Sequence, residues 1–120
     1  DHARWRRADM LQFIGVDLST PKSQVVFAPP RRPLPAAAFA RTAGKSGLAL
    51  APATILLYDQ DAFYINGERC TASPSARIAL RRLADRRTLP PSAGRSAETG
   101  DLLYAWYRAG YLYTASTPRT

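Results

Sequence analysis

Residues 54–70 have the sequence TILLYDQDAFYINGERC and contain two runs of strand-forming residues in close succession. Residues 54–58 and 63–65 are β-branched, apolar or aromatic, and the polar residues between them predict a β-hairpin. Asn66 and Gly67 form a pair that readily adopts positive φ, so they predict a second tight turn before a third strand at residues 68–70. The stretch therefore predicts an antiparallel meander, one face of which another element must cover.

A strong helix is predicted directly after the meander, from Ser73 and Pro74 to about residue 86. Ser73 is a good N-cap and Pro74 suits a first turn, while apolar residues recur at helical spacing along one face: Ala76, Ala79, Leu80 and Leu83. The outer face carries four basic residues, which are candidate contacts for a polyanion: Arg77, Arg81, Arg82 and Arg86. Asp85 lies four residues after Arg81 and partly compensates this face.

Residues 1–18 are predicted to form an amphipathic helical segment. Steps of three and four place Trp5, Ala8, Leu11, Ile14 and Leu18 along one side of it. A stripe of this size does not favour exposure, so the candidate interface residues are Trp5, Leu11, Ile14 and Leu18. The chain starts at Asp1 with this segment already under way, so we expect an excised part of a longer protein.

Residues 19–35 hold five of the ten prolines, which predicts a stiff, extended connector. We expect a short helix from about Pro35 to Gly44 or Gly47, and a strand at residues 48–50. A last helix should cover residues 98–109 with Leu102, Leu103, Trp106 and Ala109 facing inward, and Gly110 should end it. Residues 111–114 form a final strand that can add to the meander, and residues 117–120 should fray.

This order of elements predicts the α+β class. The expected architecture is a winged-helix-like domain over residues 36–116 with a small antiparallel sheet, preceded by the amphipathic helix and the connector. The helix of residues 98–109 would be the recognition element of such a domain. Its charged exterior offers Glu98, Asp101 and only Arg108, which is poor equipment for a major groove.

The net charge of +8 comes from 15 arginines and 2 lysines scattered over the whole length. A bias in genome composition explains this excess of arginine over lysine as easily as a binding surface does, so we do not expect specific nucleic-acid binding. No apolar run approaches the roughly 20 residues needed to cross a bilayer, which predicts a soluble protein with no membrane partner. Cys70 is the only cysteine and cannot form an internal disulfide, which weakly favours a cytoplasmic location.

The inventory of catalytic residue types is thin, since His2 is the only histidine. One copy of the chain cannot supply two histidines and a carboxylate to a metal, and a Ser-His-acid or Cys-His arrangement is not expected. Asp59 and Asp61 are more typical of a hairpin turn than of an acid–base pair, and Cys70 is more typical of packing than of a nucleophile. We therefore predict no catalytic, cofactor-binding or metal-binding residue in this chain.

Four stretches carry a family resemblance by their order and spacing: LSTPKSQVVFAPP, ILLYDQDAFYINGE, ALRRLADRRTL and LLYAWYRAGYLY. Together they resemble the C-terminal third of the bacterial cupin-type, JmjC-like oxygenases, the ribosomal-protein arginine hydroxylases. The resemblance covers about residues 10–116, and its most specific parts are the YINGE turn and the aromatic-rich ending after Gly110.

The resemblance implies a parent with an N-terminal cupin barrel that holds Fe(II) and 2-oxoglutarate, a helical segment that mediates homodimerisation, and a C-terminal winged helix. Such a parent would hydroxylate an arginine of a large-subunit ribosomal protein. The family's His-x-Asp and later His iron ligands have no matching positions, because Ala3 and Arg4 follow His2.

This chain would then be a non-catalytic part of a cytoplasmic enzyme, serving scaffolding, dimerisation or substrate contact. Two other functions stay open on the residues alone. The charge and the fold also suit a free-standing nucleic-acid-binding winged helix, and the thin chemistry suits an interaction module with no enzymatic parent.

Overall fold

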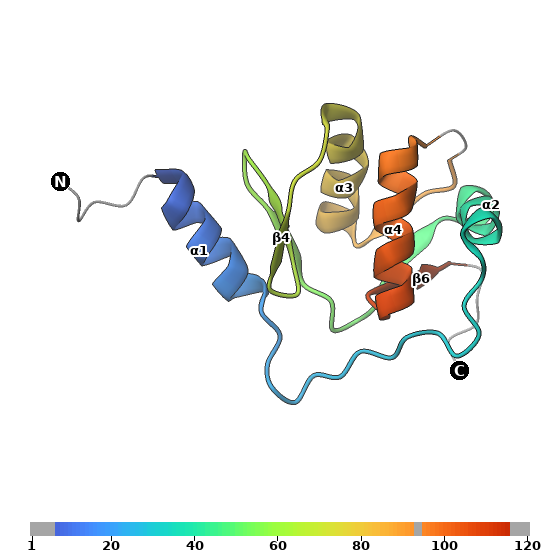
Figure 1. The fold of residues 1–120 in the computed structure, drawn as a ribbon, viewed down its shortest axis with the longest axis horizontal. Helices are drawn as coiled ribbons and strands as arrows, with labels where there is room; N and C mark the ends of the chain where they lie inside the picture. The colour runs from blue at the N-terminus through green and yellow to red at the C-terminus, as the bar shows by residue number, and fades with distance from the viewer. Residues whose placement is uncertain (1–6, 93–94, 116–120) are drawn as a thin grey trace.

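The computed structural model describes residues 7–92 and 95–115, which form four helices and six short strands (Figure 1). The predicted α+β winged-helix fold with a preceding helix and connector is confirmed. Among the described residues, no helix is long and apolar enough to cross a bilayer. The elements are α1 (Arg7–Ser19), α2 (Ala36–Ser46), β1 (Leu48–Leu50), β2 (Leu56–Tyr58), β3 (Phe63–Ile65), β4 (Glu68–Cys70), α3 (Pro74–Arg86), β5 (Thr88–Leu89), α4 (Ala97–Ala109) and β6 (Leu112–Thr114).

The meander forms as its turn chemistry predicts, with strand order β2-β3-β4 and Leu56 opposite Ile65. Asn66 and Gly67 both have positive φ, 49° and 91°, which permits the tight turn into β4. At the other turn, Asp59 Oδ1 accepts hydrogen bonds from the Asp61 and Ala62 amides at 2.8 and 2.9 Å. The interpretation of Asp59 as a turn former is therefore confirmed.

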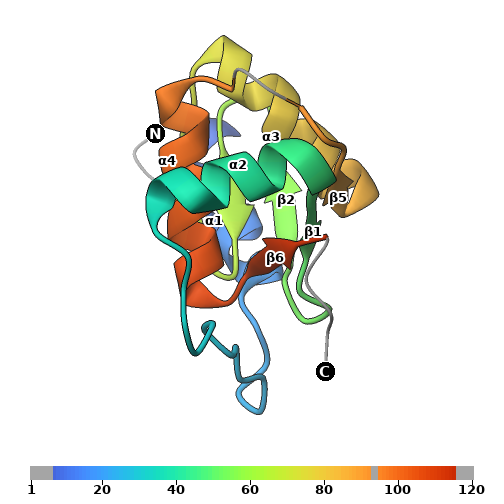
Figure 2. The same ribbon diagram turned by 90° about the vertical axis from the view of Figure 1, so that its right-hand side faces the viewer.

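The last strand does not add to the meander, and that prediction is wrong. β6 pairs with β1, which lies between β5 and β6 in a separate antiparallel sheet (Figure 2). Gly110, with φ 86°, ends α4 in the left-handed conformation, and the Ala51 N–H then donates to the Tyr111 carbonyl. This turn brings Leu112 opposite Leu50, where both side chains are buried in the core.

α3 and α4 cover the two sheets with a shared core. Ala76, Leu80 and Leu83 of α3 are buried as predicted. On α4, Leu103 and Trp106 are buried as predicted, whereas Leu102 and Ala109 are only half-buried. The helix also buries Thr99 and Tyr107, which the sequence analysis did not include.

α1 packs on the face of the meander opposite to α3 (Figure 1). Gly15 lies against the ring of Tyr64, and the Gly67 N–H donates to Ser19 Oγ at 3.0 Å. All three residues of β3 are buried, because helices cover both faces of the meander. The sequence analysis had required only one covered face.

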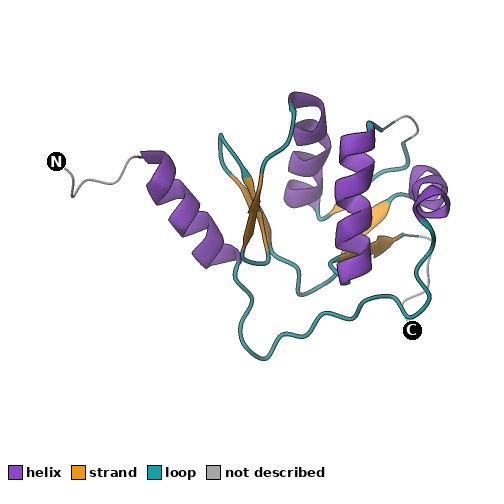
Figure 3. Cartoon of the chain, in the orientation of Figure 1, coloured by secondary structure: helices purple, strands orange, loops and turns teal. Residues whose placement is uncertain are grey.

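The connector, residues 20–35, contains no helix or strand and runs along one side of the molecule (Figure 3). The Leu34 N–H donates to the Tyr107 hydroxyl at 2.9 Å, and the Tyr104 hydroxyl donates to the Leu34 carbonyl at 2.8 Å. The division into segments 1–18, 19–35 and 36–116 stays a prediction. Residues 117–120 lie outside the described residues.

Candidate interaction surfaces

α1 is apolar on two sides, and only one of them is packed. Leu11, Gly15 and Ser19, spaced by four residues, line the side toward the meander, where Leu11 is half-buried and Ser19 is buried. The other candidate interface residues differ in what the structure shows of them. Ile14 and Leu18 are exposed by 44% and 61%, while Trp5 lies outside the described residues.

The outward side of α1 also carries Met10, which is 49% exposed, and Phe13, which is 59% exposed. Neither residue lies on the single stripe from Trp5 to Leu18 that the periodicity predicts. The small residues Gly15 and Ser19 were the available signal for the packed side. We define the α1 outer face by Met10, Ile14 and Leu18.

The four arginines predicted on α3 do not form one free face. Arg77 Nη2 donates to the carbonyl oxygens of Asp59 and Gln60 at 3.0 and 2.8 Å, which fastens the hairpin turn to α3. The Arg81 guanidinium lies 5.6 Å from the ring centroid of Tyr58. Arg81, Arg82 and Arg86 are exposed, whereas Arg77 is half-buried. Three of the four predicted arginines are therefore presented to solvent.

The exterior of α4 is close to neutral. Glu98, Asp101 and Arg108 are all exposed. The Glu98 carboxylate accepts hydrogen bonds from the Ser73 amide and hydroxyl, and these bonds lower the pKa of Glu98. Ser73 thus occupies the N-cap position of α3, while its hydroxyl donates to Glu98 in the first turn of α4. This helix offers little positive charge to a phosphate backbone.

The described side chains form no cluster of metal-ligating residues. No group of three or more His, Cys, Asp or Glu residues in the described part of the chain could hold a metal ion, and His2 lies outside that part. Burial raises the pKa of the Cys70 thiol, which disfavours the reactive thiolate. Burial alone would raise the pKa of Asp59, but hydrogen bonds from the Tyr64 hydroxyl and the two turn amides lower it.

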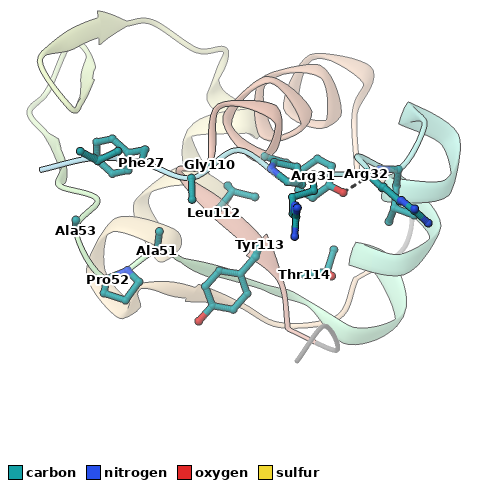
Figure 4. A pocket seen from close by; sticks show the side chains of 15 residues that line it. Phe27, Arg31, Arg32, Ala51, Pro52, Ala53, Gly110, Leu112, Tyr113 and Thr114 are labelled. Atoms are coloured by element: carbon teal, nitrogen blue, oxygen red, sulfur yellow. Dashed lines mark hydrogen bonds between the residues drawn. The ribbon is translucent and has the colours of Figure 1, made fainter. Parts of the chain in front are cut away.

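A groove of about 690 Å³ lies between the connector and β6 (Figure 4). We call it the β6 groove. Its lining is mainly apolar, and Arg31 and Arg32 are the charged residues in it. No sequence pattern predicts this groove, because its walls come from four separate segments. They are residues 26–34, the loop 51–53, the end of α4 and β6.

Comparison with known proteins gives a consistent result. The profile of the family described as ROXA-like winged helix matches residues 2–113. A structure of YcfD, a ribosomal oxygenase from Escherichia coli, superposes with a TM-score of 0.75 and 25% identity, covering 91% of this chain. The structure of YcfD with cobalt and 2-oxoglutarate gives a TM-score of 0.71 and 24% identity over 90% of this chain. No curated protein sequence matches.

The matched region is 31% of the YcfD chain in both comparisons, so this chain spans about a third of that protein. The resemblance predicted from the four sequence stretches is thereby confirmed.

Proposed function

Because this chain belongs to the ROXA-like winged helix family, we propose that it is the non-catalytic C-terminal part of a ribosomal-protein arginine hydroxylase. The observation that carries the proposal is the superposition of 91% of this chain on 31% of the chain of a ribosomal oxygenase. The parent enzyme would depend on Fe(II) and 2-oxoglutarate and act in the cytoplasm on a large-subunit ribosomal protein. One of the matched YcfD structures is a complex with 2-oxoglutarate, which supports this choice of co-substrate.

The residues of this chain do not fit an iron site of that class. Such a site takes two histidines and a carboxylate, whereas His2 is the only histidine of the sequence. Iron and 2-oxoglutarate would therefore be held by a cupin domain outside this sequence. Calorimetric titration of the chain with Fe(II) and 2-oxoglutarate should show no binding. Stoichiometric micromolar binding of both would contradict the assignment of the chemistry to another domain.

The structural role we propose for α1 is homodimer contact. The packed side fixes the helix to the meander through the Gly15 contact with Tyr64 and the hydrogen bond from the Gly67 N–H to Ser19 Oγ. The helix is therefore a rigid part of the folded unit, and its outer face is held in a defined direction. An apolar face held in this way suits an isologous contact with a second copy.

Sedimentation of the chain tests this role. We expect a dimer for the native chain and a monomer for a variant with Ile14→Asp and Leu18→Asp. The matched control carries Val26→Asp and Ile78→Asp, at side chains that are 86% and 75% exposed elsewhere on the surface. The control should remain dimeric. A native monomer, or equal dissociation of both variants, would refute the proposed dimer contact.

The alternative function is a nucleic-acid-binding winged helix, which the net charge of +8 and the exposed Arg82 and Arg86 favour. The nearly neutral exterior of α4 disfavours it. A variant with Arg82→Glu and Arg86→Glu separates the two functions in a duplex-binding assay near physiological salt. Submicromolar binding by the native chain that this variant abolishes would support the alternative.

A further inference from the structure

The β6 groove borders the open edge of a sheet. β6 pairs with β1 on one side only, because the strand order is β5-β1-β6. The Ala51 N–H donates to the Tyr111 carbonyl, and the Ala115 N–H donates to the Gly47 carbonyl at 3.0 Å. Hydrogen-bonded and non-hydrogen-bonded pairs alternate along an antiparallel ladder. The main-chain N–H and C=O of Leu112 are therefore turned away from β1, toward the groove.

The connector borders this edge without completing the sheet. Connector residues and Leu112 line the groove together, yet among the described residues no backbone hydrogen bond joins the connector to Leu112. The connector is held at other points. Leu34 bonds to Tyr104 and Tyr107, and Phe27 packs edge-on against Tyr111 with ring centroids 4.9 Å apart. A gap lined by apolar side chains is therefore left beside a strand edge.

The charge in the groove has one sign. Arg31 and Arg32 are exposed, and neither has a hydrogen-bond or ion-pair partner within residues 7–92 and 95–115. No acidic residue lines the groove. The two arginines lie toward one end, and Phe27, Pro52 and Ala53 lie toward the other (Figure 4). An occupant would therefore combine carboxylates with apolar side chains.

The aromatic rings of the groove argue against a single-stranded nucleic acid. Base stacking needs a ring face that is open to solvent. Tyr107 is buried and stacks on Phe39 with centroids 4.6 Å apart, and Phe27 packs against Tyr111. Tyr113, the third lining ring, is half-buried, and a single ring does not form a stacking platform for successive bases. The strand edge, by contrast, is the feature that an extended peptide uses.

We propose that the β6 groove binds an acidic peptide in extended conformation. The peptide adds to the edge of β6 through the main chain of Leu112, places apolar side chains over Phe27 and Pro52, and pairs its carboxylates with Arg31 and Arg32. β6 has three residues, so the paired segment is about 10 Å long. The inference does not depend on the proposed enzymatic parent, because every lining residue belongs to this chain.

The test measures fluorescence anisotropy of a labelled, end-capped peptide of alternating valine and glutamate. We expect a Kd of about 10–100 μM for the native chain. A variant with Arg31→Glu and Arg32→Glu should bind at least about tenfold more weakly. The matched control is the variant with Arg82→Glu and Arg86→Glu, which changes the net charge equally at two residues of α3 that do not line the groove. It should lose less than about threefold, because salt screens charges that do not contact the peptide.

Two further probes test the chemistry of the occupant. A peptide of alternating valine and lysine should not bind, and a valine–glutamate peptide that is N-methylated along both edges should lose its affinity. Thermal melting of the Arg31→Gln, Arg32→Gln variant should match that of the native chain, so a loss of binding by this variant reports the groove.

Several results would overturn the proposal. They are equal losses for the two charge-reversal variants, equal binding of the lysine peptide, and undiminished binding of the N-methylated peptide. Tighter binding of oligouridine than of the acidic peptide, removed by Arg31→Glu and Arg32→Glu, would identify a nucleic acid as the occupant instead.

Discussion

Gly15→Ala should destabilise the protein even though alanine is the better helix former. A Cβ at residue 15 would lie 2.5 Å from both Cδ2 and Cε2 of Tyr64 and 2.7 Å from its Cγ. Tyr64 is 2% exposed, and its hydroxyl donates to Asp59 Oδ2 at 2.7 Å. The ring cannot move aside without disturbing that hydrogen bond. α1 must therefore lift away from the meander, or the hairpin must shift.

Gly100 of α4 provides the matched control, because a Cβ there meets no atom within 4 Å. Both substitutions gain about 1 kcal/mol of helix propensity. Overpacking at residue 15 costs about 1–3 kcal/mol. We therefore expect Gly100→Ala to stabilise by about 1 kcal/mol, and Gly15→Ala to be less stable than Gly100→Ala by about 2 kcal/mol. With an m-value of about 1.5 kcal/mol/M, the two urea midpoints should differ by about 1 M.

The assay is equilibrium urea unfolding followed by circular dichroism. A second pair of variants places Gly15→Ala in a Tyr64→Ala background, where the overlap is gone and the substitution should stabilise by about 1 kcal/mol. If Gly15→Ala raises the midpoint as much as Gly100→Ala does, α1 is not seated on Tyr64. The α1 outer face would then not be held rigidly against the meander.

Gly67→Val should lower the free energy of unfolding by more than about 1 kcal/mol, because φ at this residue is 91° and a Cβ would lie 3.0 Å from Thr20 Oγ1; an unchanged urea midpoint would contradict this. Asp59 has a lowered pKa in the folded state, so it contributes stability above its ordinary pKa of 3.8 that is lost as the pH falls through the folded-state value. Between neutral and acid pH, the melting temperature of Asp59→Asn should fall less than that of the native chain. An equal fall for both proteins would contradict a stabilising role of the Asp59 carboxylate. Tyr107→Phe should cost about 1 kcal/mol in urea, because the Leu34 N–H loses its acceptor; a neutral result would show that the connector is not held there.

The meander was predictable because its information is local. The Asn66–Gly67 pair and the Asp59 side chain specify the two turns, and the residues of β3 between them are apolar or aromatic, which favours a strand. The partner of β6 was not predictable in the same way. Residues 111–114 suit either sheet. Which sheet they join depends on the direction of the chain after Gly110 and on the hydrogen bond from the Ala51 N–H to the Tyr111 carbonyl.

The α1 outer face and the β6 groove were also only partly predictable from local sequence patterns. Periodicity located α1 and its exposed Ile14 and Leu18, but both sides of the helix are apolar. The packed side is marked by Gly15 and Ser19, whose small size is informative only beside Tyr64 and Gly67. Arg31 and Arg32 are visible as a dipeptide in the sequence. Their membership of a groove depends on segments more than about twenty residues apart, which no local pattern reports.

The meander, and not the connector, sets the position of α1 in the folded chain. The connector leaves α1 beside the Ser19–Gly67 hydrogen bond and rejoins the folded body where Leu34 meets Tyr107, so both of its ends are anchored. It is a side loop, and doubling the length of such a loop costs only about 0.6 kcal/mol. A longer or shorter connector should therefore leave α1 packed on the same face of the meander. A segment joined to α1 would therefore take its orientation relative to the winged-helix domain from the packing of α1 on the meander, and not from the connector.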